Sequence, residues 1–549
     1  MTSSPDEYDN LFPEAQQNWD LDRLYADIEA INTKPLRSVE KACLRGLLCR
    51  FRPGQIAFKL NWTSGTLRVD LNKGLYRYIE ALAEQPLNTL RWDKVSEWIE
   101  ARGYKVRMVV PAESSNGCGT TDWGEAPEVP LFFGRSQELS DLASWITIDR
   151  TRLLAIWGMG GIGKTALTVK LIEKVQGEFE YLIWRSLRDV QPIGQILADW
   201  FQFLTNSQET RLDLPYLMEV LKAKRCLIVL DDFETVMQDG ELVGLYRQGC
   251  EEYGELLQRL GKERHQSCLV LLSREQPKEV AMLEGEGQFT RSFHLGGLQR
   301  KGAMKLLQAR GFSGKENGLD ALNGQYRGNP AALRIVSSTI QELFDGNVSD
   351  FLKQTQLALG DILRNLLYEQ FDRLSELETD VVYWLAIKRR PVSLNELRES
   401  MEETSSGSEL LDAIESLRWR SLIEKLVEKN SAKREVLFLL EPVVLKYVSK
   451  RFIEEVGREV KAIVTNRNFN HILLLRSHVL VEDSAPENIR AAQIRLMLKP
   501  IKDKLTRSLS KAGIAVDELT EQLAIAKQEQ STTLDDYADS NLSLLGLLI

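Results

Sequence analysis

The sequence feature that most constrains this chain is a glycine-rich octapeptide, GMGGIGKT, at residues 158–165. It fits the pattern GxxxxGK[ST], and it stands between an apolar run, LLAIW, and a helical pattern, TALTVKLIEKV. In that setting the glycines let backbone N–H groups turn toward phosphate oxygens, and the following helix presents the positive end of its dipole. The octapeptide therefore predicts a phosphate-binding loop inside an α/β domain.

Two residues of this loop carry the expected chemistry. Lys164 is predicted to reach the outer phosphates and to act in catalysis, and Thr165 to offer its hydroxyl to Mg²⁺. The alternative is a glycine-rich loop that only turns the chain. The predicted nucleotide-binding residues of the loop are Gly158, Gly160, Gly161, Ile162, Gly163, Lys164, Thr165 and Ala166.

Two carboxylates end a second apolar run, LIVLDD, at residues 227–232. Doubly wound sheets bind their ligands at the carboxyl ends of the strands. Asp231 is the predicted Mg²⁺ partner, through water, and Asp232 is the predicted catalytic residue that polarises the attacking water. The alternative for Asp232 is that it only caps the next helix.

A third strand-like run, SCLVLLSRE, ends with Arg274 and Glu275. Three apolar runs that alternate with helical patterns predict a doubly wound parallel sheet, which places Arg274 at the same edge as the phosphate loop. A guanidinium pairs bidentately with phosphate oxygens, so Arg274 is a candidate for sensing the γ-phosphate. A plain salt bridge with a neighbouring carboxylate is the alternative.

Composition and length exclude several classes of protein. A chain of 549 residues with 43% hydrophobic and 27% charged side chains has material for several folded domains, not for a fibrous or disordered chain. An acidic amino terminus and the lack of a long apolar run predict a cytoplasmic protein with no membrane partner. Six scattered cysteines predict reduced, structural thiols, and four scattered histidines predict that any metal is bound by oxygen.

Four motifs together resemble a known family. GMGGIGKT, LIVLDD, LLSRE at 271–275 and GNPAAL at 328–333 are similar to the NB-ARC type of signal-transduction ATPases with numerous domains, the STAND class. This class includes plant disease-resistance proteins and the apoptosis protease-activating factor, and the resemblance covers about 129–455. It implies ATP or ADP, with Mg²⁺, as cofactors. Further nucleotide contacts that the resemblance implies are Phe133, Gly134 and Arg135, around the adenine and ribose, and Pro330, on the base.

The expected fold class is multidomain α/β plus α. It comprises a P-loop NTPase domain with a doubly wound parallel sheet, a helical bundle and a winged helix, preceded by an α-helical domain of helix-turn-helix type. Three helical patterns and two strand-like runs, LIEKLVEK and REVLFLL, independently indicate the winged helix. The predicted segments are a disordered tail at 1–18, the helix-turn-helix-like effector or adaptor domain at 19–110, a linker at 111–128, the nucleotide-binding domain at 129–298, the helical bundle at 299–365, the winged helix at 366–455 and a helical carboxyl-terminal region at 456–549.

The predicted winged helix departs from the family at one position. A His-Asp pair is usual there, and its histidine contacts the β-phosphate of ADP, whereas this chain has Leu439-Leu440-Glu441-Pro442. We therefore expect ADP to be held less tightly, or by another residue.

The surrounding sequence is still more similar to multidomain proteins of this class that are common in cyanobacteria. The segments FGRSQELSDLASWI, HQSCLVLLSREQP and LLRSHVLVEDSAPENIRAAQIRLMLKPI carry this likeness. Many such proteins continue into a WD-repeat propeller, and this chain stops about where such an array begins. We expect either a separate sensor protein or a truncated or minimal member of the class.

Basic side chains gather near the amino terminus, where residues 34–77 hold ten basic against two acidic ones in a chain of formal charge −9. The sequence GQIAFKLNWTSGTLRVDLNKGLYRYI has the form of a helix, a turn and a second helix. It resembles the helix-turn-helix found on cyanobacterial NTPases and on proteins associated with the von Willebrand A and MoxR system. Arg68, Lys73 and Arg77 would meet DNA from the second helix, whereas a protein-recruiting adaptor with a basic face is the alternative.

The predicted function is an ATP/ADP-dependent signal-transduction switch. ADP keeps the core closed, exchange for ATP with Mg²⁺ opens the winged helix and permits self-association, and slow Mg²⁺-dependent ATP hydrolysis resets it. One alternative is a DNA-binding transcription regulator gated by nucleotide, and another is an interaction scaffold with a weak nucleotide site. Residues 456–549 include an amphipathic stretch that either docks a partner or forms a solvated tail.

Overall fold

The computed structural model divides into two compact units, residues 1–114 and 115–549. Each unit is described separately. The structure describes residues 11–12, 15, 19–32, 35–49, 51, 53, 56–57, 60, 67, 71, 74–86, 90–105, 119–205, 212–285, 289–354, 367–401, 406–428, 435–466, 473–512 and 536–546.

The first unit is helical. Its apolar residues, among them Leu24, Leu44 and Ile79, form one buried core. The predicted turn and most of the second helix of the helix-turn-helix, including Arg68 and Lys73, lie outside the described residues. The described helices are α2 (Leu21–Asn32), α3 (Ser38–Leu48), α6 (Leu75–Leu82) and α7 (Val95–Ala101), with the 3₁₀ turn η2 (Trp92–Lys94).

The second unit begins with a six-stranded sheet in the order β1-β3-β4-β5-β2-β6, in which every neighbouring pair is parallel. This confirms the predicted doubly wound sheet. The edge strand β1 lies inside the segment that we predicted as a linker. The strands are β1 (Thr120–Asp122), β2 (Leu153–Trp157), β3 (Tyr181–Ser186), β4 (Cys226–Asp231), β5 (Cys268–Ser273) and β6 (Thr290–His294).

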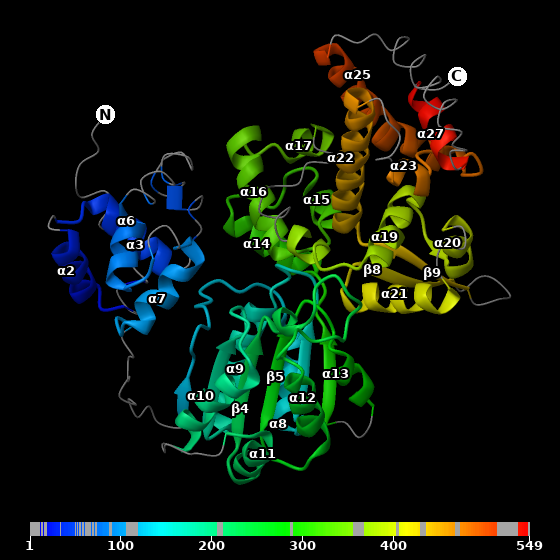
Figure 1. Ribbon diagram of the computed structural model, residues 1–549. Helices are drawn as coiled ribbons and strands as arrows, with labels where there is room; N and C mark the ends of the chain where they lie inside the picture. The colour runs from blue at the N-terminus through cyan, green and yellow to red at the C-terminus, as the bar shows by residue number, and fades with distance from the viewer. Residues whose placement is uncertain are drawn as a thin grey trace. The chain divides into compact units, whose positions relative to one another are not determined.

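Both faces of this sheet are covered by helices (Figure 1). Alternation along β2 shows why the strand is apolar throughout, because Leu153 and Ala155 enter one core while Leu154 and Ile156 enter the other. One core includes residues of α10 (Ile193–Thr205), α11 (Leu214–Ala223) and α12 (Glu252–Lys262), and the other includes residues of α8 (Ser136–Thr147) and α9 (Lys164–Val175). Three further short elements are η3 (Gln176–Glu178), η4 (Phe233–Val236) and α13 (Lys278–Leu283).

Next along the chain come the helical bundle and the winged helix. The small sheet of the winged helix is antiparallel in the order β7-β9-β8, so the predicted two-stranded wing gains a short third strand. The bundle contains α14 (Arg300–Ala309), α15 (Leu319–Gln325), α16 (Pro330–Phe344) and α17 (Val348–Gln354). The winged helix contains α19 (Glu376–Lys388), β7 (Val392–Ser393), α20 (Leu394–Ser400), α21 (Gly407–Trp419), β8 (Ile423–Glu428) and β9 (Glu435–Leu440).

The long helix α22 (Pro442–Asn466) carries the chain from the winged helix into the carboxyl-terminal region, and the boundary predicted at 455 falls inside it. One hydrophobic core continues from the bundle through the winged helix to this region. Within the described residues no helix is long and apolar enough to span a membrane. The remaining elements are α23 (Leu474–Ser477), α24 (Glu487–Gln493), the π-helical turn η5 (Ile494–Leu498), α25 (Lys499–Ala512) and α27 (Asp536–Leu545).

Candidate nucleotide-binding site

The phosphate loop joins the end of β2 to the start of α9. Gly161 and Gly163 have φ of 73° and 100°, in the left-handed region that favours glycine. At Gly158 an added Cβ would lie 2.7 Å from the carbonyl oxygen of Leu295, which no side chain could tolerate. These glycines therefore shape the loop and let it pass close to the end of β6.

Lys164 is the first residue of α9, and its Nζ donates to the carbonyl oxygens of Gly158 at 2.8 Å and of Met159 at 3.3 Å. Burial lowers the pKa of this lysine, and the nearby carboxylates oppose that shift. The ammonium group thus lies within the loop, where it can exchange carbonyl partners for phosphate oxygens. Its predicted contact with the outer phosphates stays a prediction.

Thr165 and Asp231 come together as predicted for a Mg²⁺ site. The hydroxyl of Thr165 donates to Oδ2 of Asp231 at 3.0 Å, and Asp231 is buried. Burial and, next, the neighbouring Asp232 raise the pKa of Asp231. A hydroxyl and one carboxylate suit Mg²⁺, which uses few protein ligands beside phosphates and water. Among the described residues no cluster of three or more His, Cys, Asp or Glu offers another metal site.

Asp232 has φ of 57° and precedes the turn η4, but its side chain makes no capping bond there. Its Oδ2 instead accepts from the hydroxyl of Ser186 at 3.1 Å and pairs with the guanidinium of Arg188 at 3.1 Å. The carboxylate is therefore aimed by two groups from the end of β3. Sequence reasoning did not identify Arg188, because its proximity arises from strand pairing.

Arg274 follows β5 and is held by two carboxylates. Its Nε lies 3.0 Å from Oε1 of Glu234, and its Nη2 lies 3.1 Å from Oε2 of Glu369. These are the ion pairs that our alternative interpretation expected. The carbonyl oxygen of the preceding residue, Ser273, accepts from the N–H of Gly158 at 3.2 Å, so Arg274 follows directly after a contact with the phosphate loop. Sensing of the γ-phosphate therefore stays a prediction.

Arg135 is buried and holds the site together through protein contacts. Its guanidinium donates to the carbonyl oxygens of Gly296 at 2.6 Å and Ile162 at 3.3 Å, and it pairs with Glu138 at 3.0 Å. The arginine thus ties the phosphate loop to the segment after β6. The two residues before Arg135 were also predicted to contact the adenine and ribose. Gly134 has φ of 69°, and Phe133 packs against the core of the helical bundle.

The start of α16 contacts the phosphate loop from the bundle side. Asn329 caps this helix by accepting from the N–H groups of Ala331 and Ala332, both at 3.1 Å, and its Nδ2 donates to the carbonyl oxygen of Gly160 at 3.2 Å. Pro330 is the first helical residue, and its Cγ lies 3.9 Å from where a Cβ on Gly163 would stand. Asn329 stands inside the quoted GNPAAL motif, yet we did not single it out.

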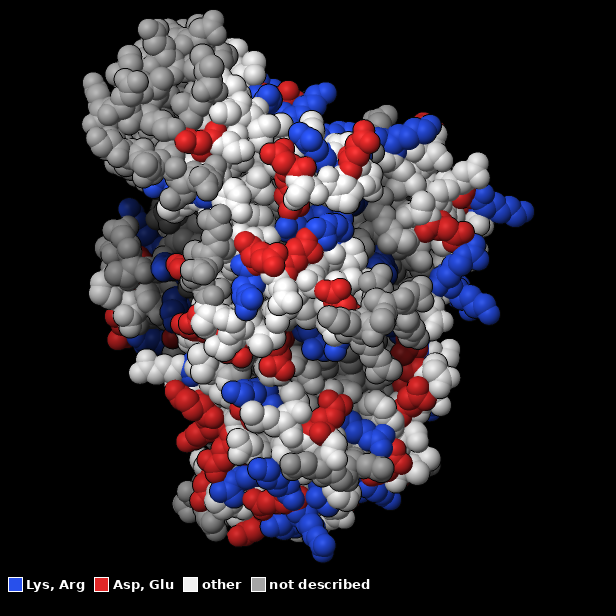
Figure 2. Space-filling model, turned by 90° about the vertical axis from the view of Figure 1, so that its right-hand side faces the viewer, with Lys and Arg blue, Asp and Glu red and all other residues white. Residues whose placement is uncertain are grey.

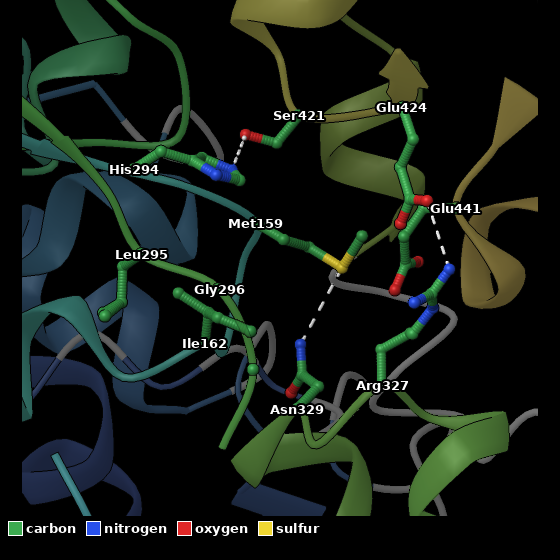
Figure 3. A pocket seen from close by; sticks show the side chains of 11 residues that line it. Met159, Ile162, His294, Leu295, Gly296, Arg327, Asn329, Ser421, Glu424 and Glu441 are labelled. Carbon is green, nitrogen blue, oxygen red and sulfur yellow. Dashed lines mark hydrogen bonds and ion pairs between the residues drawn. The ribbon is translucent and has the colours of Figure 1, made fainter. Parts of the chain in front are cut away.

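A cavity of about 230 Å³ lies where three parts of the second unit meet. Figure 3 shows Met159 of the phosphate loop facing Asn329 and Arg327 of the bundle, with Ser421, Glu424 and Glu441 across from them. Two contacts cross between the walls: His294 Nε2 lies 3.2 Å from the hydroxyl of Ser421, and Arg327 pairs with Glu424 at 3.1 Å. The lining residues are Met159, Ile162, His294, Leu295, Gly296, Gly297, Arg327, Asn329, Ser421, Glu424 and Glu441.

Glu441 occupies the segment where the family has its histidine. Its carboxylate accepts from the N–H groups of Val443 at 3.1 Å and Val444 at 3.4 Å, so it caps the start of α22. Burial raises its pKa to about 7. The histidine that does line the cavity is His294, which sequence reasoning missed; it comes from the opposite wall, and its ring lies 4.4 Å from that of Trp157.

Buried ion pairs join the nucleotide-binding domain to the winged helix behind the cavity. Glu275, the residue after Arg274, accepts from Arg373 at 2.8 Å and from Arg420 at 2.5 Å. Arg420 also pairs with Glu378 at 3.0 Å, and all three groups are essentially inaccessible to water. Buried charges persist only where they are paired and hydrogen-bonded, so this network depends on the two domains staying together.

Comparison with known proteins gives a family match. Residues 135–247 match the NB-ARC domain. An uncharacterized WD repeat-containing protein of Nostoc sp. is 38% identical over 461 residues, which are 76% of this chain and 36% of that protein. A disease resistance-like protein of Arabidopsis thaliana, DSC1, is 27% identical over 226 residues, which are 38% of this chain and 17% of that protein. The chain thus spans about a third or less of the length of these relatives.

Solved structures show a more distant likeness. A Walker-type ATPase of Pyrococcus abyssi has 13% identity and a TM-score of 0.41, over 58% of this chain and 96% of that one. The Orc1 protein of Aeropyrum pernix, solved in complex with DNA, has 15% identity and a TM-score of 0.30, over 59% of this chain and 94% of that one.

The range 135–247 that matches the NB-ARC domain includes the phosphate loop, its lysine and the Thr165–Asp231 pair. The chain therefore contains an NB-ARC domain, a nucleotide-binding P-loop domain of the STAND type, and is related to plant disease-resistance proteins and to a WD-repeat protein of Nostoc.

Proposed function

We propose that this protein is a signalling switch that ADP holds closed and that ATP with Mg²⁺ opens. The observation that carries the proposal is the cavity beside the phosphate loop, whose lining comes partly from Ser421, Glu424 and Glu441 of the winged helix. The affinity of the protein for a ligand in such a cavity changes when the winged helix moves. By linkage, ADP and ATP then shift the closed-open equilibrium through their different affinities for the two states.

In this proposal, Arg274 and Glu275 transmit the effect of a bound nucleotide to the winged helix. The two residues are adjacent at the end of β5, and Arg274 follows directly after a contact with the phosphate loop while Glu275 lies in the buried ion-pair network. A γ-phosphate that draws the guanidinium away from Glu234 and Glu369 would shift this segment. Because a buried charge that loses its partner is costly, a small displacement of Glu275 would weaken the closed state strongly.

Slow ATP hydrolysis would reset the switch. Mg²⁺, when bound by Thr165 and Asp231, supplies charge neutralisation at the outer phosphates. Lys164 would stabilise charge on the transferred group, and Asp232, aimed by Ser186 and Arg188, would orient the attacking water. These contacts position water and compensate charge, which is most of what phosphoryl transfer needs from a protein.

The first unit is the proposed output module, acting on a protein partner or on DNA. DNA binding is the second candidate function, favoured by the excess of basic residues at 34–77. Three of these side chains are already engaged within the unit: Arg37 pairs with Glu40, Lys41 pairs with Glu29, and the buried Arg45 donates to the carbonyl oxygen of Leu11. Protein recruitment is therefore our preferred reading.

The surface in Figure 2 carries blue and red side chains interspersed, without one large patch of a single sign. This mixed pattern among the described residues of that face favours contacts with other proteins there. Self-association in the ATP state, and a sensor supplied by another chain or by a continuation of this one, complete the proposal.

The test uses protein purified without added nucleotide. Released nucleotide is identified after denaturation, and the native protein is then sized by light scattering with ADP and with ATP plus Mg²⁺. Co-purified ADP, and a larger species only with ATP, are the expected results. Protein that contains no nucleotide, and whose mass changes with neither ADP nor ATP, would overturn the proposed switch. That result would favour the interaction scaffold with a weak nucleotide site.

A further inference from the structure

A second cavity lies at the opposite edge of the large sheet from the phosphate loop. Its volume is about 570 Å³. Arg152, which lines it, directly precedes β2, whereas the phosphate loop follows that strand, so the two sites are separated by the length of β2. The other lining residues come from the end of α12 and the loop after it, from the end of α13 and from the residue before β6: Gly261, Lys262, Arg264, Leu283 and Phe289.

Three of the six lining residues are cations, and no carboxylate among the described residues forms an ion pair with them. Across the described residues Arg152, Lys262 and Arg264 form no ion pair, in contrast to most arginines of this sheet. Two carboxylates nearby in sequence, Glu263 and Glu284, are engaged elsewhere, and a third, Glu286, lies outside the described residues. Glu263 pairs with Lys222 and Arg259, and Glu284 accepts two hydrogen bonds from Ser292.

The cationic group of Arg152 is fixed in place before any ligand arrives. Its Nη1 donates to the carbonyl oxygen of Glu263 at 3.1 Å, and its guanidinium lies 4.0 Å from the ring centre of Phe289. Burial and then repulsion by Arg264 lower the pKa of Arg152. Like charges held together in a hollow are an unfavourable arrangement that a bound anion would relieve.

At Gly261 the backbone of α12 packs closely against α13 and β6 at the base of the cavity. A Cβ on Gly261 would stand 2.7 Å from Cδ1 of Leu283 and 2.8 Å from the hydroxyl of Thr290, so a larger residue would push α12 away from β6. The hydroxyl of Thr290 is buried and has no hydrogen-bond partner among the described residues. The ring of Phe289 is 38% exposed, which leaves part of it free to stack on a planar group.

We propose that this cavity binds a small phosphate-bearing molecule with at least two negative charges, independently of the nucleotide at the phosphate loop. The volume lies within the range of small-molecule sites, roughly 300–1,000 Å³. The three cations line one hollow, where they can reach a single polyanion from two segments, the residue before β2 and the end of α12 with the loop after it. Two kinds of ligand carry such phosphate groups: a free polyphosphate chain, and a nucleotide whose base stacks on Phe289.

The experiment uses the full chain carrying Lys164→Ala, so that binding at the phosphate loop is weakened and the second site can be resolved from it. Inorganic tripolyphosphate and, separately, AMP are titrated in by calorimetry at about 150 mM salt, where long-range charge effects are screened. We expect one saturable site. Tighter binding of tripolyphosphate identifies a polyphosphate ligand, and tighter binding of AMP identifies a nucleotide.

Two pocket variants and one control then locate the site. Arg264→Gln changes an exposed side chain and should weaken binding about tenfold or more without affecting folding, because it removes a charge-assisted contact. Arg152→Gln should do the same. Arg310→Gln, an exposed arginine on the helical bundle, should leave the affinity unchanged. No saturable binding, or equal weakening in all three variants, would overturn the proposal. Because Lys164 is absent throughout, neither result depends on the proposed switch.

Discussion

Arg420 and Glu275 form a fully buried ion pair, with Nη1 and Oε1 2.5 Å apart, that joins the winged helix to the residue after the candidate γ-phosphate sensor. The two residues are 145 positions apart in the sequence. It lies on the boundary that a switch of this kind would have to open.

Replacing Arg420 by methionine should destabilise the closed arrangement. Glu275 and Glu378 would remain buried without their shared partner, which costs about 3–5 kcal/mol. We expect a lower first unfolding transition and faster release of ADP, measured by calorimetry and stopped-flow fluorescence. Arg418→Met is the matched control, since Arg418 lies two residues away on the exposed side. Equal stability of the two variants would contradict the prediction.

Lys164→Ala should weaken ATP and ADP binding by about tenfold to a hundredfold, because a charge-assisted contact to phosphate is lost. The fold should persist, since the side chain contacts only carbonyl oxygens of the loop. Fluorescent nucleotide titration and circular dichroism check both points. Lys170→Ala, on the same helix, should bind as the parent does, because Lys170 pairs with Glu173.

Asp232→Asn should slow hydrolysis by about a hundredfold or more and leave nucleotide affinity within a few-fold of the parent, because it removes the group that orients water. Arg188→Ala should lower the rate less, by releasing the carboxylate that it pairs with. Single-turnover phosphate release measures both. A rate that Asp232→Asn does not change would reduce this residue to a structural role.

Stability should depend on pH through Glu441, whose folded-state pKa is about 7 against an ordinary value of 4.5. A raised carboxyl pKa favours the folded protein at low pH, because the native state keeps a proton that the unfolded chain releases. That advantage is complete below about pH 4.5 and is lost as the pH rises through about 7, a change of at most about 3 kcal/mol.

Glu441→Gln should remove this dependence while keeping an oxygen to cap α22. Relative to the parent, the variant should therefore gain stability between pH 5 and pH 8. Glu435→Gln, an exposed change on β9, should track the parent at both values. Unfolding midpoints at the two pH values provide the comparison, and parallel curves for all three proteins would contradict it.

Ser421→Ala should speed ADP release about fivefold, since it removes one neutral hydrogen bond between the winged helix and His294. His294→Ala should have the same effect, and the double variant should add little to either. Such non-additivity is the signature of a direct contact. Additive effects in the release rates would show that the two side chains act separately.

Features that depend on neighbouring residues in sequence could be predicted. The phosphate loop, the apolar strands and the carboxylates Asp231 and Asp232 at the end of β4 follow from local pattern and from the rule that parallel strands end at one edge. The edge strand β1 could not be predicted, because three polar residues, TTD, form a strand only by pairing with β3.

The contacts across the domain boundary were also beyond sequence reasoning. Glu275, Arg373 and Arg420 look like ordinary surface charges when taken singly, and only the packed structure shows them to be buried together. His294 was missed for the same reason, since its partner Ser421 lies 127 residues away. Tertiary ion pairs of this kind leave no periodic signal.

The bundle, the winged helix and the carboxyl-terminal helices share one continuous hydrophobic core. Apart from Met159 and Leu298, the described residues of this core follow the nucleotide-binding domain, so we expect the proposed opening to move the bundle, the winged helix and the carboxyl-terminal helices together. Helix α22 has 25 residues and is about 37 Å long, so a tilt of about 10° at its base would carry its far end about 6 Å. Exchange of ADP for ATP, which differ by one phosphate, would then displace the far end of α22, which is distant in sequence from the phosphate loop.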